Sequence, residues 1–190
     1  MSAWIQMISD DSAGPELKAA LDRARTPAGT VDNVMRVHSL RPHTMDAHVG
    51  LYKAVLHDDN NTLPLWFLEL VGTYTSMLNK CDYSYANHSA NFTDLLGKPE
   101  RANAMLEALK SSDLEKVFTE KEHALLRYTR KLTLEPGAMD SADVQAARDA
   151  GASDGEILEV NQVCGYFCYA NRLLSGLGVS LRGDHVGYYR

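Results

Sequence analysis

The sequence predicts an all-α fold built around a central helical hairpin. Apolar residues recur with helical spacing through most of the 190 residues, and no stretch alternates with a period of two for long enough to indicate a strand. Prolines, glycines and capping residues divide this pattern into separate helices. Two apolar segments, over about 64–78 and 81–96, flank a short break at Asn79 and Lys80, which predicts the hairpin.

Three helices are expected before the hairpin. Capping residues at 10–12 and a first-turn proline predict a helix over 15–25. A short helix over 31–38 and a longer one over 42–57 follow. Their inward apolar positions are Val34, Val37, Met45, Val49, Tyr52 and Val55.

The helices expected after the hairpin cover residues 99–110, 119–132, 140–150 and 153–176. Two capping boxes, Thr119 to Glu122 and Ser153 to Glu156, mark where the second and the last of them begin. Residues 177–190 combine glycines with paired tyrosines, so an arm is expected there and no helix.

Four side chains of the hairpin are candidates for chemistry. Cys81, Ser84 and His88 are spaced by three and four residues, so a helix places them on one face. Glu69 lies nearly as far before the turn as His88 lies after it, and antiparallel helices would bring these two residues level. We therefore predict a hydrogen bond between the Glu69 carboxylate and the His88 imidazole.

These residue types suit an active site. A cysteine at a helix N-terminus, as expected for Cys81, is stabilised as a thiolate by the helix dipole and by unpaired N–H groups. His88 can transfer a proton while Glu69 fixes its tautomer, and Ser84 lies where such a relay would pass the proton on. Taken one at a time, a cysteine, a serine and a histidine on an amphipathic helix are more often ordinary core or surface residues.

The pattern E-x11-C-x2-S-x3-H, formed by Glu69, Cys81, Ser84 and His88, resembles the motif of the alkylhydroperoxidase D and carboxymuconolactone decarboxylase superfamily, whose usual form is E-x11-C-x2-C-x3-H. The resemblance implies an alkylhydroperoxidase D-like helical bundle. For the redox members it implies a dithiol whose second cysteine, nearest the histidine, attacks peroxide. Ser84 occupies that position here, and a serine forms neither a sulfenic acid nor a disulfide.

Other segments resemble the peroxidase-related branch of the same superfamily. They are VDNVMRV at 31–37, EHALLRYTRKLT at 122–133, ANRLLSGLGV at 170–179 and GYY at 187–189. The resemblance thus extends over nearly the whole chain. It implies assembly into a homo-oligomer, for which terminal arms would be a plausible means.

Three functions are compatible with these residues. The one we favour at this point is a thiol peroxidase of antioxidant defence, which acts on a small hydroperoxide with an unknown thiol reductant. Cys81 would be its redox residue, and Glu69 and His88 its proton relay. The second is non-redox acid–base chemistry of His88 and Glu69 on a small organic acid. The third is a catalytically silent helical oligomer.

Composition narrows the class of protein. An apolar fraction of 45% and a charged fraction of 23% are typical of a globular chain, and the length suits a single domain over 1–190. The formal charge of -6 argues against a nucleic-acid partner. No segment approaches the ~18 uninterrupted apolar residues of a membrane span, and the first residues lack a signal-peptide pattern. We expect no membrane association and a cytoplasmic location.

Neither a metal site nor a cofactor is expected. The three cysteines, Cys81, Cys164 and Cys168, have the spacing of neither a disulfide framework nor a zinc site. The histidines in the first third of the chain do not share one helical face, so scattered surface positions are expected for them. They are His38, His43, His48 and His57.

One internal repeat concerns the last helix. The tripeptide that begins at Tyr85 recurs at Tyr169, which aligns Cys168 with Ser84. Cys164 and Cys168 lie at i and i+4, on one face of that helix. Either they are small core residues, or one of them approaches Cys81 from another helix or subunit.

Overall fold

The computed structural model describes residues 2–26 and 28–188, and every regular element in that part of the chain is a helix. The α-helices are α1 (Pro15–Arg23), α2 (Asn33–Arg36), α3 (Pro42–Leu56), α4 (Leu65–Leu78), α5 (Asp82–Leu96), α6 (Pro99–Ser111), α7 (Glu120–Leu134), α8 (Ser141–Asp149) and α9 (Asp154–Gly176). Two 3-10 helices, η1 (Asp10–Ser12) and η2 (Pro136–Ala138), complete the set. The all-α prediction is confirmed.

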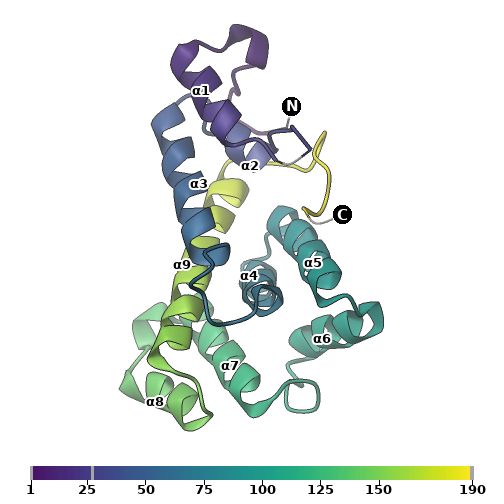
Figure 1. Cartoon of the computed structure of the whole chain (residues 1–190), viewed down its shortest axis with the longest axis vertical. Coiled ribbons are helices and arrows are strands. Elements are labelled where there is room, and N and C mark those ends of the chain that lie inside the picture. Colours follow the sequence, from purple (N-terminus) through teal and green to yellow (C-terminus); the bar gives the residue numbers. More distant parts are fainter. Residues whose placement is uncertain (1, 27, 189–190) are drawn as a thin grey trace.

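Helix α4 forms the centre of the fold. It is surrounded by α5, α7 and α9, and Figure 1 shows it end-on among them. Every residue from Phe67 to Ser76 is buried, which agrees with the apolar character of this helix on all sides. Its buried hydroxyl groups at Thr73, Thr75 and Ser76 donate to the carbonyl oxygens four residues earlier, so they add no unpaired polar group to the core.

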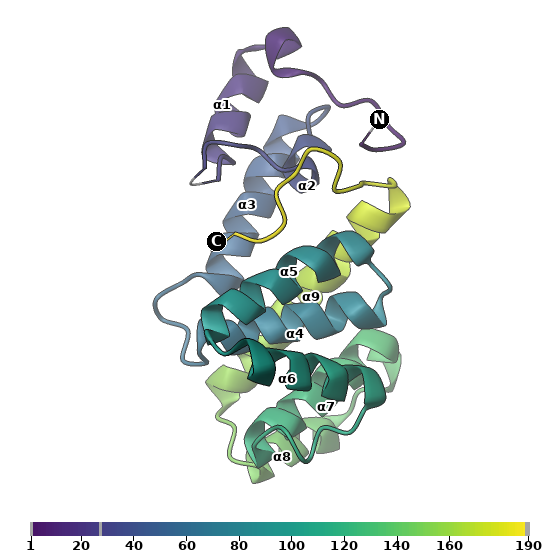
Figure 2. The same ribbon diagram turned by 90° about the vertical axis from the view of Figure 1, so that its right-hand side faces the viewer.

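Helix α9, with 23 residues, runs along most of the molecule and contacts α3, α4 and α7. Figures 1 and 2 show α1 to α3 gathered around one end of α9, while α7 and α8 lie at the other. After α9 the chain turns back as an extended segment and crosses towards α5. Backbone hydrogen bonds from Trp4 to Leu177 and from Ser180 to Ser2 join this segment to the start of the described chain.

The helix boundaries follow the predicted caps. The boxes at Thr119 and Ser153 are both formed, and Asp140 forms a third one at the start of α8. The largest difference is α2, which is shorter than the predicted 31–38. Asp32 is its extended N-cap, and after Arg36 the chain continues in tight turns instead of α-helix. The segment after α9 has no helix up to residue 188, as predicted; residues 189 and 190 of the predicted arm lie outside the described residues.

Two of the histidines expected at the surface are buried, so that prediction was wrong for them. His38 and His48 are 6% and 2% exposed, and their Nε2 and Nδ1 atoms lie 2.9 Å apart. The reason is tertiary: α3 packs against both α2 and α9, which covers the face that carries His48. Among the described residues, no cluster of three or more potential ligands could hold a metal ion. No described helix is long and apolar enough to cross a membrane.

Candidate active site

The predicted pairing of Glu69 and His88 is present. Nδ1 of His88 on α5 lies 2.6 Å from Oε2 of Glu69 on α4. Because a carboxylate only accepts, Nδ1 carries the proton, and Nε2 is then the nitrogen with a lone pair. The other carboxylate oxygen, Oε1, accepts a hydrogen bond from the amide of Asn91 at 3.3 Å. The Glu69 side chain is 0% exposed, so both of its oxygens are held by protein groups.

An aromatic ring holds the imidazole from another side. Phe167 on α9 meets His88 edge-to-face, with ring centroids 4.5 Å apart and an interplanar angle of 90°. This ring fits because Gly72 on α4 has no side chain: a Cβ there would lie 2.2 Å from Cε2 of Phe167. The orientation of His88 is therefore fixed by a carboxylate on one helix and a ring on another.

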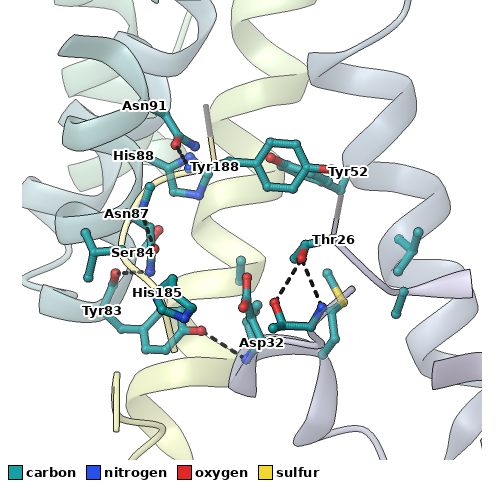
Figure 3. A pocket seen from close by; sticks show the side chains of 18 of the residues that line it. Thr26, Asp32, Tyr52, Tyr83, Ser84, Asn87, His88, Asn91, His185 and Tyr188 are labelled. Atoms are coloured by element: carbon teal, nitrogen blue, oxygen red, sulfur yellow. Dashed lines mark hydrogen bonds between the residues drawn. The ribbon is translucent and has the colours of Figure 1, made fainter. Parts of the chain in front are cut away.

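His88 lies in the wall of a cavity of about 590 Å³ between α3, α5 and α9. The segment between α1 and α2 and the last described residues, 185–188, close it further (Figure 3). Its polar wall groups include Tyr52, Tyr83, Ser84, Asn87 and Asn91, and its apolar ones include Val49, Phe167, Ala170 and Leu174. Since Nδ1 is bound to Glu69, Nε2 is the imidazole atom that can meet a molecule in this cavity.

Ser84 reaches the cavity, but its hydroxyl belongs to a polar cluster beneath the wall. Its oxygen is hydrogen-bonded to the hydroxyl of Ser76 at 2.9 Å, and Ser76 also accepts from the amide of Asn171 at 3.2 Å. That amide in turn accepts from Asn79 at 3.0 Å. The predicted motif residue is thus at the site, tied into contacts between α4, α5 and α9.

Among the motif residues around the second hairpin helix, Ser84 and His88 line the cavity, whereas Cys81 does not. It is the N-cap of α5, as predicted, and it is 3% exposed. Its side chain packs in an apolar cluster with Val37, Leu174 and Val179. The cause is its place before the first turn of α5, where the chain leaves a tight turn whose residue Lys80 has φ 55. The structure therefore brings Ser84 and His88 to one cavity, binds His88 to the fully buried Glu69, and leaves the Cys81 thiol in a neighbouring part of the core.

The other two cysteines lie on the predicted common face of α9. Cys164 is buried beside Thr133, with 3.2 Å between sulfur and oxygen, and Cys168 is partly exposed beside Asn79. A hydrogen bond between the two thiols lowers the pKa of Cys168 and raises that of Cys164. Cys164 meets α7, while Cys81 belongs to the separate apolar cluster described above. All three cysteines are free thiols.

A buried chain of hydrogen bonds runs from the cavity through α3. The hydroxyl of Tyr166, whose ring lines the cavity, lies 2.8 Å from Nε2 of His48. His48 contacts His38, and His38 contacts Thr44 at 2.8 Å, whose hydroxyl donates to a backbone carbonyl. Because the Thr44 hydroxyl donates to that carbonyl, it accepts from Nδ1 of His38. Nε2 of a neutral His38 then accepts from Nδ1 of His48, which leaves Nε2 of His48 to accept from the Tyr166 hydroxyl. Burial and the neighbouring His38 lower the pKa of His48 to about 4.

Several groups at the site were not predicted from the sequence. Asn87 and Asn91 follow Ser84 by three and seven residues, so their position on the same face of α5 was available as a signal. Tyr166 and Phe167 lie three and two residues before the repeated tripeptide of α9, without a motif of their own. For residues 184–188 the sequence indicated an arm but not its partners, because Gly187 and Tyr188 bind side chains 100 and 97 positions away.

Comparison with known proteins rests on structure alone. No family model matches the sequence, and no curated protein does. Among solved structures, an uncharacterized peroxidase-related protein from Ralstonia eutropha, described as an alkylhydroperoxidase AhpD core, is 20% identical with a TM-score of 0.80, covering 94% of this chain and 92% of that one. A peroxidase-related protein from a Silicibacter species is 19% identical with a TM-score of 0.80, covering 100% and 96%.

A third similar structure is the debrominase Bmp8 in complex with 2,3,4-tribromopyrrole. It is 15% identical to this chain with a TM-score of 0.76, and the match covers 96% of this chain and 94% of the debrominase. These similarities, together with the helical hairpin and its paired Glu69 and His88, establish that the chain has the alkylhydroperoxidase D-like fold. The fold expected from the motif is confirmed.

Proposed function

We propose that this protein is an enzyme in which His88, oriented by Glu69, acts as a general base and acid on a small organic molecule bound in the cavity. One observation carries the proposal: Nδ1 of His88 is held by a buried carboxylate at 2.6 Å while the same imidazole lines a cavity of about 590 Å³. A histidine whose tautomer is fixed by a third group is the usual form of a catalytic base.

The chemical step follows from this arrangement. Nε2 accepts a proton from an acidic C–H or O–H bond of the bound molecule, and the bonding pair stays on the molecule as an anion. The imidazolium that forms is stabilised by the Glu69 carboxylate at its other nitrogen. Return of the proton to a different atom gives an isomerised or otherwise rearranged product, and the base is restored.

The cavity suggests the class of substrate. Tyrosines and asparagines line it together with apolar residues, which suits a small molecule with both a ring or chain and a polar group. The cation of Lys53 is part of the lining and can pair with a carboxylate. The similar fold of the debrominase holds a small ring compound, 2,3,4-tribromopyrrole. We therefore propose a small organic acid as the substrate.

The thiol-peroxidase function is the second candidate. It is favoured by the N-cap position of Cys81 and by the likeness to peroxidase-related proteins. In that reaction the Cys81 thiolate would attack a hydroperoxide and become a sulfenic acid, an alcohol would leave, and an external thiol would reduce the sulfenic acid. Its weak point is access, because a peroxide would have to reach a side chain that is 3% exposed.

Hydrogen–deuterium exchange tests the first candidate without knowledge of the full reaction. Small organic acids with an acidic C–H bond are incubated with the protein in D₂O and followed by NMR. We expect exchange that His88→Gln reduces by about 10²–10⁴-fold, the usual contribution of a general base. Exchange that stays at the rate of the buffer for all acids, or that survives His88→Gln, would show the proposal to be wrong. Cys81→Ser separates the candidates, since only peroxide reduction depends on that thiol.

A further inference from the structure

The chain after α9 is anchored to the site by side chains of α2 and α5. The Asp184 carboxylate accepts from the hydroxyl of Tyr83 at 2.5 Å and from the backbone N–H of Asn33 at 3.0 Å. The Asn33 amide donates to the carbonyls of Ser180 and Arg182, both at 3.0 Å. These contacts direct residues 185–188 across the opening between α3 and α5, where they line the cavity (Figure 3).

Two asparagines then bind consecutive backbone groups of this C-terminal segment, residues 184–188. The N–H of Gly187 donates to Oδ1 of Asn87 at 3.3 Å, and the N–H of Tyr188 donates to Oδ1 of Asn91 at 2.6 Å. The asparagines are four residues apart, so they lie one above the other on the cavity face of α5. Figure 3 shows Asn91, His88 and Tyr188 close together at one side of the cavity.

The amide of Asn91 has a second partner. While its oxygen accepts from Tyr188, its Nδ2 donates to Oε1 of Glu69 at 3.3 Å. A backbone N–H only donates and a carboxylate only accepts, so the two partners demand the same orientation of the amide. Asn87 differs in this respect, because its Nδ2 donates to the carbonyl of Tyr83, within its own helix.

We infer that Asn91 is a positioning residue that couples the docking of the C-terminal segment to the pairing of His88 with Glu69. With the segment docked, the Tyr188 N–H holds the oxygen of Asn91 away from Glu69 and keeps Nδ2 on the carboxylate. Without it, the oxygen of Asn91 loses this partner, and the side chain is free to leave the rotamer in which Nδ2 reaches Glu69. The carboxylate then loses one of its two hydrogen-bonded supports, and the hold on His88 weakens. Docking of the C-terminal segment over the cavity and the geometry of His88, the catalytic base, thus change together.

This inference rests on the proposed function, because it concerns how His88 is held in position as a base when the C-terminal segment closes the cavity. Its test needs no substrate. The protein is labelled with ¹⁵N in its histidine rings, and the His88 Nδ1–H signal is followed by NMR at one pH well above the usual histidine pKa of ~6.5. The ionisable side chains near the ring, Glu69, His57 and Tyr52, are unchanged in every variant that is compared.

Two variants at one position isolate the hydrogen bond. Tyr188→Pro and Tyr188→Ala both remove the ring, and only the proline also removes the N–H that reaches Asn91. We expect the His88 Nδ1–H signal to be lost by exchange with water, or to shift, in the proline variant and to be retained in the alanine variant. Asn91→Leu should reproduce the effect of proline, while the Gly187 amide signal reports whether the segment is docked.

Deletion of residues 184–190 provides the second measurement if the proline variant stays docked. An unchanged His88 signal in a protein whose segment has been released would overturn the inference. Loss of the signal equally in Tyr188→Ala and Tyr188→Pro would also overturn it, because the backbone N–H would then be irrelevant. Neither result depends on whether any organic acid undergoes exchange, so failure of the coupling and failure of the acid–base proposal are distinguishable.

Discussion

A Cβ atom on Gly72 would lie 2.2 Å from Cε2 of Phe167, so these two residues define how closely α4 and α9 approach beside the imidazole. Phe167 is 0% exposed and its ring is packed between Gly72 and the imidazole of His88, so an added methyl group would displace it. We predict that Gly72→Ala lowers the free energy of unfolding by about 1–3 kcal/mol, the usual cost of overpacking a core. Because Phe167 also contacts His88, proton-exchange activity should fall too.

The matched test of this steric explanation is the double variant Gly72→Ala with Phe167→Leu. The smaller side chain leaves room for the added methyl group, so urea unfolding should show a smaller loss from Gly72→Ala in this background than in the wild type. Equal losses in the two backgrounds would mean that the clash with Phe167 is not the cause.

Ser84→Cys restores the usual two-cysteine motif of the fold. The new thiol would line the cavity one turn before His88, in contrast to Cys81. We expect the variant to consume hydroperoxide faster than the wild type in the presence of a small thiol reductant, because the cavity then holds a group that can form a sulfenic acid. Ser84→Ala is the control, since it breaks the same hydrogen bond to Ser76 without adding a thiol. A Ser84→Cys protein no more active than this control would contradict the prediction.

The three cysteines should differ in their rates of alkylation. Cys168 is partly exposed, and its lowered pKa gives it more thiolate at neutral pH than an ordinary cysteine has. Cys81 and Cys164 are 3% and 0% exposed, so they should react much more slowly in the folded protein. Mass spectrometry after brief treatment with iodoacetamide measures this order. In urea the three rates should converge, and fast reaction of Cys81 in the folded state would instead support the thiol-peroxidase candidate.

The buried histidines should make stability depend on pH. The pKa of His48 falls from 6.5 to about 4 on folding, so the unfolded chain takes up a proton at a higher pH than the folded one. The stability due to neutral His48 is therefore complete above about pH 6.5 and is lost as the pH falls towards about 4, by about 3 kcal/mol in total. Burial also lowers the pKa of His38, which acts in the same direction.

Urea unfolding at several pH values checks this prediction. His48→Gln removes the titrating group while it keeps an acceptor for the Tyr166 hydroxyl. The free energy of unfolding of this variant should fall less steeply between about pH 6.5 and about pH 4 than that of the wild type. Parallel curves for the two proteins would show that His48 does not titrate in the expected range.

The sequence predicted well the helix limits and the contacts that helix geometry alone determines. The helix limits near Thr119 and Ser153 follow from side chains that bond within their own first turn. The pairing of Glu69 with His88 follows from the length of two helices on either side of one turn, so the spacing was sufficient. The position of Ser84 beside His88 was also predicted, because the two residues lie on one face of α5.

The remaining features depend on which surfaces meet, and spacing does not determine that. Cys81 was expected beside the others, but as an N-cap it lies before the first helical turn, and segments from the two ends of the chain cover it. His48 was expected at the surface, but α9 packs against α3 and covers it with Tyr166. Asn91 binds a backbone N–H that lies 97 positions away, and a backbone group has no signature in a sequence.

The burial of α4 from Phe67 to Ser76 makes this helix the most protected part of the structure. Amide protons in that stretch should be the last to exchange with deuterium, since they are released only by global unfolding. The carboxylate of Glu69 is attached to this slowest-exchanging element, whereas much of the cavity wall comes from α3, the segment before α2 and residues 185–188. The side chains of those walls can be redesigned for a different ligand while α4 is left unchanged and the backbone N–H of Tyr188 that binds Asn91 is kept.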